Sequence, residues 1–465
     1  MTTPTLPSTP VHPRGSPQGD VRNLSSPLRT LARVLLIASI CGAPWAIGAV
    51  EPWGWGALMI LCLLALILWA VGCAQRGVLR ITWTPLYWPF LAFLVLAAVQ
   101  LLAGLNSDPI ATREAVLKLF TDLVFFFLAG QLLNASPENG RALETFGLIV
   151  TLLAFALCIL GLAQILWSAG PRLIYWSISV QGSPFGPYVN HNDYAGLMEM
   201  LLAISVGYIL SQSWTPVVRF LLWSGVVLVI TSIWMSGSRG GAVALLIEGV
   251  IWAGVLLLSR PRSVSLGSLS LLLAVVVSAA AIFSWMVSSG WVGGYAWSVF
   301  ESSRPLDVTI GDRLRVGVDT LRMAAKHPLM GIGVGCFERA FPTYMTFASD
   351  LHWTHAHDDI AEALAETGVP GLMIIVVALF VFFRMAFRHV EERLQHKWGW
   401  VQMGATVGAI GLLVHSFVDF NLRIPANAAW FVVCVAIASH PRSSSGRPHK
   451  APRESAPASN SGYVT

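Results

Sequence analysis

Long apolar runs separated by short polar segments dominate the pattern of this sequence. A helix that crosses a membrane needs about 20 mostly apolar residues. About 12 runs meet this condition, with approximate limits 31–50, 56–73, 85–104, 115–134, 145–168, 194–212, 216–235, 241–259, 268–289, 370–388, 401–419 and 426–440. The pattern therefore predicts an all-α, polytopic membrane protein with about 12 transmembrane helices.

The composition agrees with a chain surrounded by lipid. Of its 465 residues, 55% are hydrophobic and only 11% are charged, whereas a soluble domain carries about 25% charged residues. So few charges cannot cover a chain of this length with a hydrated surface. The net charge of +5 comes mostly from short loops and tails. It therefore indicates membrane topology and argues against a nucleic-acid partner.

The basic residues favour one orientation in the membrane. When the N-terminus is placed in the cytoplasm, the inner loops carry most of the basic side chains, among them Arg76, Arg80, Arg141, Arg219, Arg260, Arg262, Arg384, Arg388, Arg393 and Lys397. Cytoplasmic loops of membrane proteins are enriched in Lys and Arg. We therefore expect a membrane protein with both tails in the cytoplasm.

This topology divides the chain into three parts. Residues 1–30 and 441–465 are rich in Pro and Ser and are predicted to be disordered cytoplasmic tails. Residues 31–440 form the predicted transmembrane domain. Its longest outer segment, 290–369, contains an amphipathic pattern at 312–326, so we expect short helices in this outer loop. The size of the outer segments indicates that the chemistry takes place on that face.

Two histidines, His355 and His357, lie near the end of the outer segment. His357 falls at the predicted start of a short helix close to the membrane, where a neutral imidazole could take a proton from a sugar hydroxyl. Two other interpretations stay open. His357 could be a solvated loop residue, or His355, His357 and a carboxylate could bind a metal ion.

The short helix after His357 has an acidic face. Asp359, Glu362 and Glu366 are spaced i, i+3 and i+7, which places them on one side of a helix. Gly368 is expected to end this helix, and Pro370 suits the first turn of the next one, which enters the membrane. The acidic face could also be simply hydrated.

Arginines on the outer side are candidates for binding an anion. Arg239 lies in the segment MSGSRGGAV, between two apolar runs, and Arg313 and Arg315 open the amphipathic stretch. A positive group at membrane level is costly unless it has a partner, and a lipid diphosphate is a natural one. Arg239 could equally be an interfacial residue whose side chain reaches the surface. The glycines of GIGVG do not form a dinucleotide-binding motif, because Cys336 stands where the third glycine would be.

The segment GSPFGPYVNHNDYAGL, at 182–197, offers polar groups suited to sugar hydroxyls. Asn190 and Asn192 supply both hydrogen-bond donors and acceptors. The alternative is that Asn192 or Asp193 caps the next helix.

These segments resemble, in the same order, those of the bacterial O-antigen ligase and O-antigen polymerase family. The family pattern H-[N/S/Q]-x9-G-x-x-G is matched by His357, then Asp358, nine residues, Gly368 and Gly371. The second position departs from the pattern, because Asp358 replaces an amide or Ser. The segments SGSRGG, HPLMGIGVG and YVNHNDYAG are also similar to family segments. The motif-bearing resemblance covers roughly residues 180–440.

The resemblance implies a metal-independent glycosyltransferase without a cofactor, in the bacterial inner membrane, with its active site facing the periplasm. The donor would be a glycan on undecaprenyl diphosphate, and the acceptor a sugar hydroxyl. His357 corresponds to the family's proposed general base, and Arg239 and Arg313 correspond to arginines that bind the diphosphate. Together with Arg315, Asn190, Asn192 and Asp358, these arginines make up the expected substrate-binding residues.

Three functions are compatible with this sequence. An O-antigen ligase, which transfers the glycan to the lipid A core, is the first expectation. A polysaccharide polymerase, which transfers it to another lipid-linked repeat unit, is the close alternative. A membrane transporter is the alternative from a different class, but the sequence shows no internal repeat of the kind found in many transporters.

Overall fold

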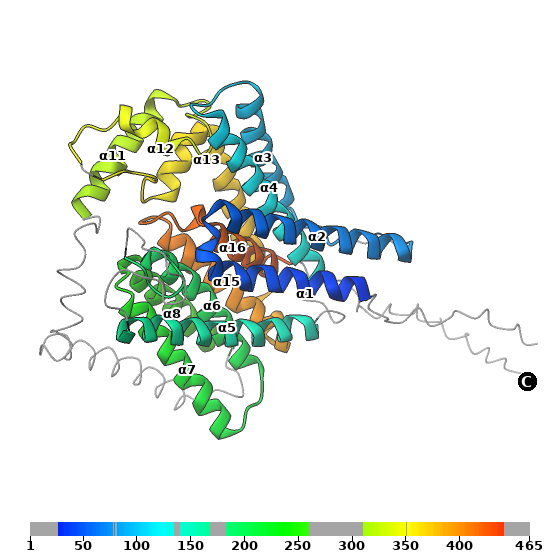
Figure 1. Cartoon of the computed structure of the whole chain (residues 1–465). Coiled ribbons are helices and arrows are strands. Elements are labelled where there is room, and N and C mark those ends of the chain that lie inside the picture. Colours follow the sequence, from blue (N-terminus) through cyan, green and yellow to red (C-terminus); the bar gives the residue numbers. More distant parts are fainter. Residues whose placement is uncertain are drawn as a thin grey trace, which may run out of the picture.

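The structure is a computed structural model, and it describes residues 27–77, 79, 81–133, 140–167, 183–259, 310–349 and 351–440. Within these residues every regular element is a helix, apart from one isolated bridge between Phe185 and Tyr188 (Figure 1). The predicted all-α fold is confirmed. The predicted helix 268–289, the first part of the outer loop up to 309 and nearly all of both predicted tails lie outside the described residues.

Each predicted apolar run outside 268–289 coincides with a described helix. These helices are α1 (Pro27–Gly42) with the 3-10 helix η1 (Ala43–Ala49), α2 (Pro52–Arg76), α3 (Tyr87–Leu102), α4 (Pro109–Leu132), α5 (Gly140–Trp167), α6 (His191–Ser211), α7 (Pro216–Met235), α8 (Arg239–Ser259), α13 (Asp359–Ala386), α15 (Lys397–His415) and α16 (Pro425–Ala438). The shorter elements are α11 (Ile310–Lys326), α12 (Phe337–Ala340), η2 (Phe341–Thr343), α14 (Val390–Leu394) and η3 (Asn421–Arg423).

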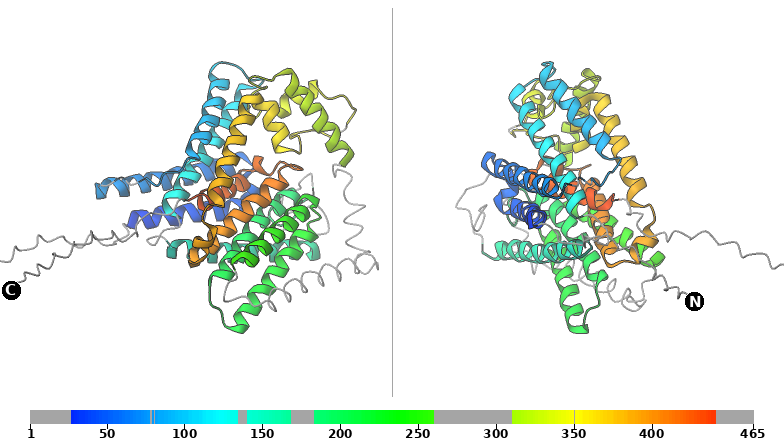
Figure 2. Two further views of the ribbon diagram at one scale, coloured as in Figure 1. Left: turned by 180° about the vertical axis from the view of Figure 1, so that it is seen from behind. Right: turned by 90° about the vertical axis from the view of Figure 1, so that its right-hand side faces the viewer.

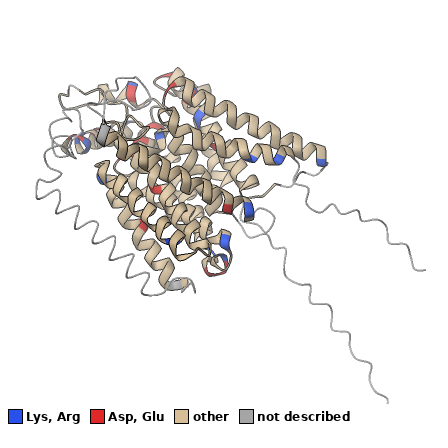
Figure 3. Ribbon diagram, turned by 60° about the horizontal axis from the view of Figure 1, so that its bottom comes forward, with Lys and Arg blue, Asp and Glu red and all other residues tan. Residues whose placement is uncertain are grey.

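Among the described residues, 8 helical segments are long and apolar enough to cross a membrane. They correspond to α1 with η1, α2, α4, α5, α6, α7, α8 and α13. The apolar helices α3 and α16 are shorter, with 16 and 14 residues. The protein is therefore a polytopic helical membrane protein, whereas the number of about 12 spans stays a prediction. Charged residues lie mainly near helix ends and in connections, as Figure 3 shows.

Helices α6 and α15 form the interior of the membrane domain. In the 18-residue apolar stretch of α6, 89% of the residues are buried inside the protein, whereas only 17% are buried in the corresponding stretch of α13. Glycines allow α6 and α15 to approach closely, because a side chain at Gly207 would collide with the backbone of Trp400, and one at Gly408 would collide with Met200. The less buried helices carry the apolar side chains that suit lipid.

The elements α11, α12, η2 and the first part of α13 gather at one end of the molecule, opposite α6, α7 and α8 (Figures 1 and 2). They enclose a separate core that includes Val316, Met323, Phe337, Phe341 and Trp353. The described part of the predicted outer loop therefore carries short helices, as expected from its amphipathic pattern.

Helix α13 changes character at Gly368, where the backbone leaves helical geometry with φ 67° and ψ −168°. This confirms the predicted break before Pro370. The Gly331-Ile332-Gly333 segment packs against the polar part of α13, with the Ile332 amide donating to the Ala365 carbonyl at 3.0 Å. Gly331 and Gly333 have positive φ and have no room for a side chain. These glycines serve close backbone packing.

Candidate functional site

The candidate site is built around residues 415–424, which join α15 to α16 and which we call the α15–α16 connection. It contains a turn after His415 and the short helix η3. The amide of Asp359 donates to the Ser416 carbonyl at 2.9 Å, and the Leu422 amide donates to the Asp359 carboxylate at 3.1 Å. The start of α13 is thus fixed to this connection on both sides.

His357 contacts a buried carboxylate in the connection. Its Nδ1 atom lies 3.3 Å from Oδ1 of Asp419, and the Asp419 side chain is only 1% exposed. The rings of Phe420 and Trp353 lie edge-on to the imidazole, at centroid distances of 4.9 and 5.8 Å. A carboxylate at Nδ1 favours the tautomer with its proton on that atom, which leaves Nε2 as the proton acceptor.

The backbone and burial of His357 agree with this orientation. Its φ of 54° is uncommon for a residue other than glycine, and such conformations cluster at functional sites. The Nδ1 atom is buried and contacts Asp419 at ion-pair distance without hydrogen-bond geometry, while the side chain as a whole is 12% exposed. The accessible part of the imidazole therefore lies away from Asp419.

Arg313, from α11, reaches the same carboxylate. Its Nη1 donates to the Val418 carbonyl at 2.7 Å and lies 3.7 Å from Oδ2 of Asp419. Burial alone would raise the pKa of Asp419, but His357, Arg313 and His415 together lower it well below the usual range of a carboxyl group. Asp419 is therefore a carboxylate shared between a histidine and an arginine.

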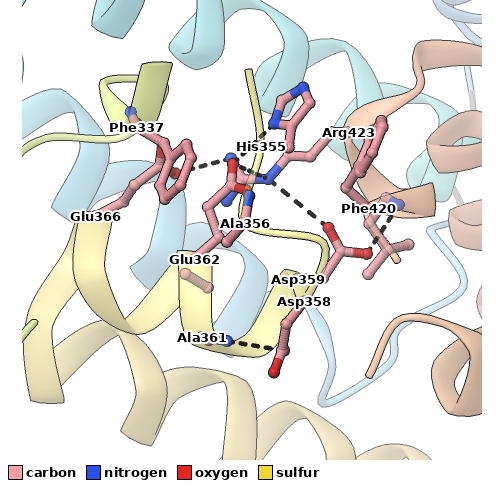
Figure 4. Close-up of polar contacts among 12 residues, drawn as sticks. Phe337, His355, Ala356, Asp358, Asp359, Ala361, Glu362, Glu366, Phe420 and Arg423 are labelled. Atoms are coloured by element: carbon pink, nitrogen blue, oxygen red, sulfur yellow. Dashed lines mark hydrogen bonds and ion pairs between the residues drawn. The ribbon is translucent and has the colours of Figure 1, made fainter. Parts of the chain in front are cut away.

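A second charged cluster lies beside the first, centred on Arg423 (Figure 4). The guanidinium lies 2.8 Å from Glu366, 3.3 Å from Glu362 and 3.8 Å from Asp359. All three carboxylate residues are at most 4% exposed. The interpretation of this acidic face as hydrated is therefore wrong, because the face is buried around a cation. Burial lowers the pKa of Arg423, but the surrounding carboxylates raise it above its ordinary value.

His355 belongs to the second cluster and not to the first. Its Nδ1 lies 3.0 Å from Glu362, and its ring stacks on Phe420 at 4.6 Å. His355 and His357 thus contact different carboxylates. In the part of the chain that the structure describes, no three His, Cys, Asp or Glu side chains are arranged to hold a metal ion.

Three of the predicted binding residues lie at the start of helices. Asp358 caps α13, because its carboxylate accepts from the Ile360 and Ala361 amides at 2.9 and 3.0 Å. Asn190 caps α6 by accepting from the Asn192 amide at 3.0 Å. The cap of α6 is therefore Asn190, and not Asn192 or Asp193 as the alternative supposed. Asn192 itself is buried, at 5% exposure.

The remaining predicted arginines are exposed. Arg239 is the first residue of α8, and Gly240 next to it packs directly against the ring of His415. Arg315 points outward from α11 and forms no ion pair with another described residue. The structure therefore joins His357 and Arg313 through Asp419. It places Arg239 beside Gly240, which contacts His415 of the α15–α16 connection, and it leaves Arg315 at the surface.

Sequence reasoning did not single out Asp419 or Arg423. Arg423 lies between the last two predicted helices, and Asp419 is the last residue of the predicted helix 401–419, at the end expected on the same face as His357. Charged residues in a short connection between apolar runs were the available signal, but the sequence did not indicate which side chains they would contact.

A cavity of about 540 Å³ adjoins the second cluster. Glu338, His355 and Arg423 line its charged end, and Glu114, Lys118 and Asp122 of α4 also line it. Its apolar part lies between α3, α4, α13 and α16 and is lined by residues that include Phe90, Leu379, Phe382, Phe431 and Val435. The cavity thus combines a charged end, next to the site, with walls suited to hydrocarbon.

Comparison with protein-family models matches residues 224–376 to the family described as O-antigen ligase. The match includes Arg239, Arg313 and His357, whereas Asp419 and Arg423 follow it. No curated protein matches the chain. The resemblance first indicated by the motifs is therefore confirmed.

Proposed function

We propose that this membrane protein, related to the O-antigen ligase and O-antigen polymerase family, transfers a glycan from undecaprenyl diphosphate to an acceptor sugar hydroxyl at the periplasmic face. The family indicates an enzyme of glycosyltransferase type that acts on lipid-linked glycans. The observation that carries the proposal is the contact between His357 and the buried Asp419, which Arg313 also approaches. We favour transfer to the lipid A core, as in a ligase.

In the proposed reaction His357 acts as the general base. The acceptor hydroxyl gives its proton to Nε2 while its oxygen forms a bond to the anomeric carbon of the donor sugar. Asp419 stabilises the imidazolium that results, because its carboxylate lies at Nδ1. General base catalysis by one positioned group contributes about 10²–10⁴-fold to a rate.

The leaving diphosphate takes the electron pair of the glycosidic bond and gathers negative charge. The periplasm has no ATP, so the free energy for transfer comes from the donor's own phosphate ester. Fixed guanidinium groups stabilise such developing charge. Arg239 and Arg315 are exposed and can approach a lipid headgroup, while Arg313 stays close to Asp419.

The cavity between α3, α4, α13 and α16 supports a lipid substrate. Its apolar walls suit a hydrocarbon chain, and its charged end contains His355, whose ring stacks on Phe420. Phe420 in turn contacts His357. A lipid chain held in this cavity would bring its headgroup towards the general base.

His357→Ala tests the proposal. We expect the variant to insert into the membrane and to lose glycan transfer by about 100-fold or more, since the base is removed. The measurement is transfer by purified protein, with membrane insertion as the control. Transfer at the wild-type rate would refute the role of His357.

The product that accumulates in a strain lacking the protein separates the two reactions. Long glycan that stays on its carrier indicates a ligase. Single repeat units that stay uncoupled indicate a polymerase, which is the second candidate within the same family.

A further inference from the structure

A histidine and a glutamate form a buried pair that the proposed mechanism does not use. Nδ1 of His415, the last residue of α15, lies 2.9 Å from Oε1 of Glu199 in α6. The two side chains are 1% and 0% exposed. Ionisable groups inside a membrane protein are costly and usually have a function. The pair therefore calls for an explanation beyond the packing of α6 on α15.

The other side of the His415 ring contacts the turn that carries Arg239. Oγ of Ser238 lies 3.4 Å from Nε2 of His415 and also accepts from the Gly241 amide at 3.1 Å. A side chain at Gly240 would collide with the His415 ring, and one at Gly241 would come within 3.1 Å of Glu199. The two glycines of SGSRGG thus allow this turn to lie directly on the His415–Glu199 pair.

Hydrogen bonds connect the main chain of His415 to the turn that carries Asp419, the partner of the proposed base. Its carbonyl accepts from the Val418 amide at 3.0 Å, and the Val418 carbonyl accepts from Arg313 at 2.7 Å. Asp419, the next residue, contacts His357. His415 therefore touches the Arg239 turn through its ring and supports the Asp419 turn through its main chain.

We propose that His415, held in place by Glu199, is a positioning residue that fixes the Arg239 turn relative to the group formed by His357, Asp419 and Arg313. This inference rests on the proposed function, in which Arg239 approaches the leaving diphosphate and His357 is the general base. His415 itself does not touch substrate. Its ring acts as a rigid spacer between α6, the Arg239 turn and the α15–α16 connection.

A double-mutant cycle on the full-length protein tests this role. His415→Ala and Arg239→Ala are made singly and together, and kcat and the KM for an undecaprenyl-diphosphate-linked glycan are measured. We expect His415→Ala to lower kcat/KM about tenfold or more, and the double variant to retain about tenfold more activity than independent effects predict. The same cycle with Arg315→Ala should be additive, because Arg315 is exposed on α11 and lies on none of these contacts.

Conservative variants separate positioning from folding. His415→Asn keeps a donor close to the position of Nδ1, facing Glu199, but lacks the ring that touches Gly240. We expect it to fold with a somewhat lower thermal unfolding temperature, because the lost ring leaves a small cavity, while the donor KM rises. Glu199→Gln should lower transfer, whereas Glu248→Gln, the same change at a buried glutamate of α8, should leave it unchanged.

Additive effects of His415 and Arg239, or an unchanged donor KM in His415→Asn, would overturn the positioning role. If His415→Ala does not fold, Glu199→Gln replaces it in the same cycle. Absence of transfer by the wild-type protein would instead contradict the proposed function. The two failures are therefore distinguishable.

Discussion

At the scale of single residues, the site depends on a carboxylate that holds an imidazole. His357 adopts a backbone conformation with φ 54°, and Asp419 lies 3.3 Å from its Nδ1. The motif identified the histidine, while its partner lies in a segment outside the motif. Asp358, the position where the chain departs from the family pattern, caps α13 with its carboxylate. An Asn side chain can cap a helix in the same way, so this departure preserves the local structure.

The lowered pKa of Asp419 predicts how stability depends on pH. A carboxyl whose pKa is lower in the folded state stabilises the fold above its unfolded pKa and ceases to do so as pH falls through the folded value. We expect Asp419→Asn to be less stable than the wild type at neutral pH. The difference should shrink only below about pH 3.9, the ordinary pKa of Asp.

Thermal unfolding of both proteins in detergent across this pH range is the measurement. Glu338→Gln is the control, because Glu338 is 55% exposed and should affect stability little at any pH. A difference between Asp419→Asn and the wild type that disappears already near pH 6 would contradict the assignment.

At the scale of elements, the polar first part of α13 is joined to the α15–α16 connection by charge. Arg423 contacts Asp359, Glu362 and Glu366, which come from two successive turns of α13. The Glu366 carboxylate also accepts from the Phe337 amide at 3.2 Å, so the cluster reaches α12. These contacts fix the orientation of the segment that begins immediately after His357.

Arg423→Met should therefore destabilise the protein strongly. Removing the cation leaves three buried carboxylates without it, and breaking a buried ion pair costs about 3–5 kcal/mol. Arg322→Met is the control, because Arg322 is 58% exposed and its partner Asp319 keeps hydrogen bonds from the amide and hydroxyl of Thr346, so we expect a smaller loss. Unfolding in detergent measures both. Equal losses in the two variants would show that the cluster is not a main stabilising contact.

At the scale of the whole molecule, the described residues form a polar end that contains α11, α12 and the first part of α13, and a membrane domain with α6 and α15 at its centre. The charged clusters lie where these parts meet, at the α15–α16 connection. The cavity leads from this region along the apolar part of α13 as far as Phe382. This arrangement suits an enzyme whose substrates are partly in lipid and partly in water.

Filling the cavity tests whether lipid occupies it. Ala378 lines the cavity, whereas the adjacent Val377 is not among its lining residues and is 48% exposed. We expect Ala378→Trp to lower transfer from a donor with the full polyprenyl chain by about tenfold, given the sensitivity of packed sites to added volume. A donor with a short chain should be affected less, and Val377→Trp should behave as the wild type. Equal use of both donors by Ala378→Trp would refute the assignment.

The sequence by itself determined the features that depend on neighbouring residues. Apolar runs of sufficient length specify helices that suit a membrane, and the described helices coincide with them. Gly368 and Pro370 specified the break in α13, because glycine readily adopts positive φ and proline suits the first turn of a helix. The spacing of the motif also indicated His357 and the family resemblance.

Only the tertiary structure decided which side chains meet. Asp419 and Arg423 come from the α15–α16 connection, and no local periodicity relates them to His357 or to the acidic face of α13. Helical periodicity places Arg313 and Arg315 on different faces of α11, but only the packing of the helices decided that the Arg313 face approaches Asp419 while Arg315 remains exposed. The physical reason is that contacts between distant segments depend on how whole helices pack, whereas a hydrophobic pattern specifies only the face and length of each helix.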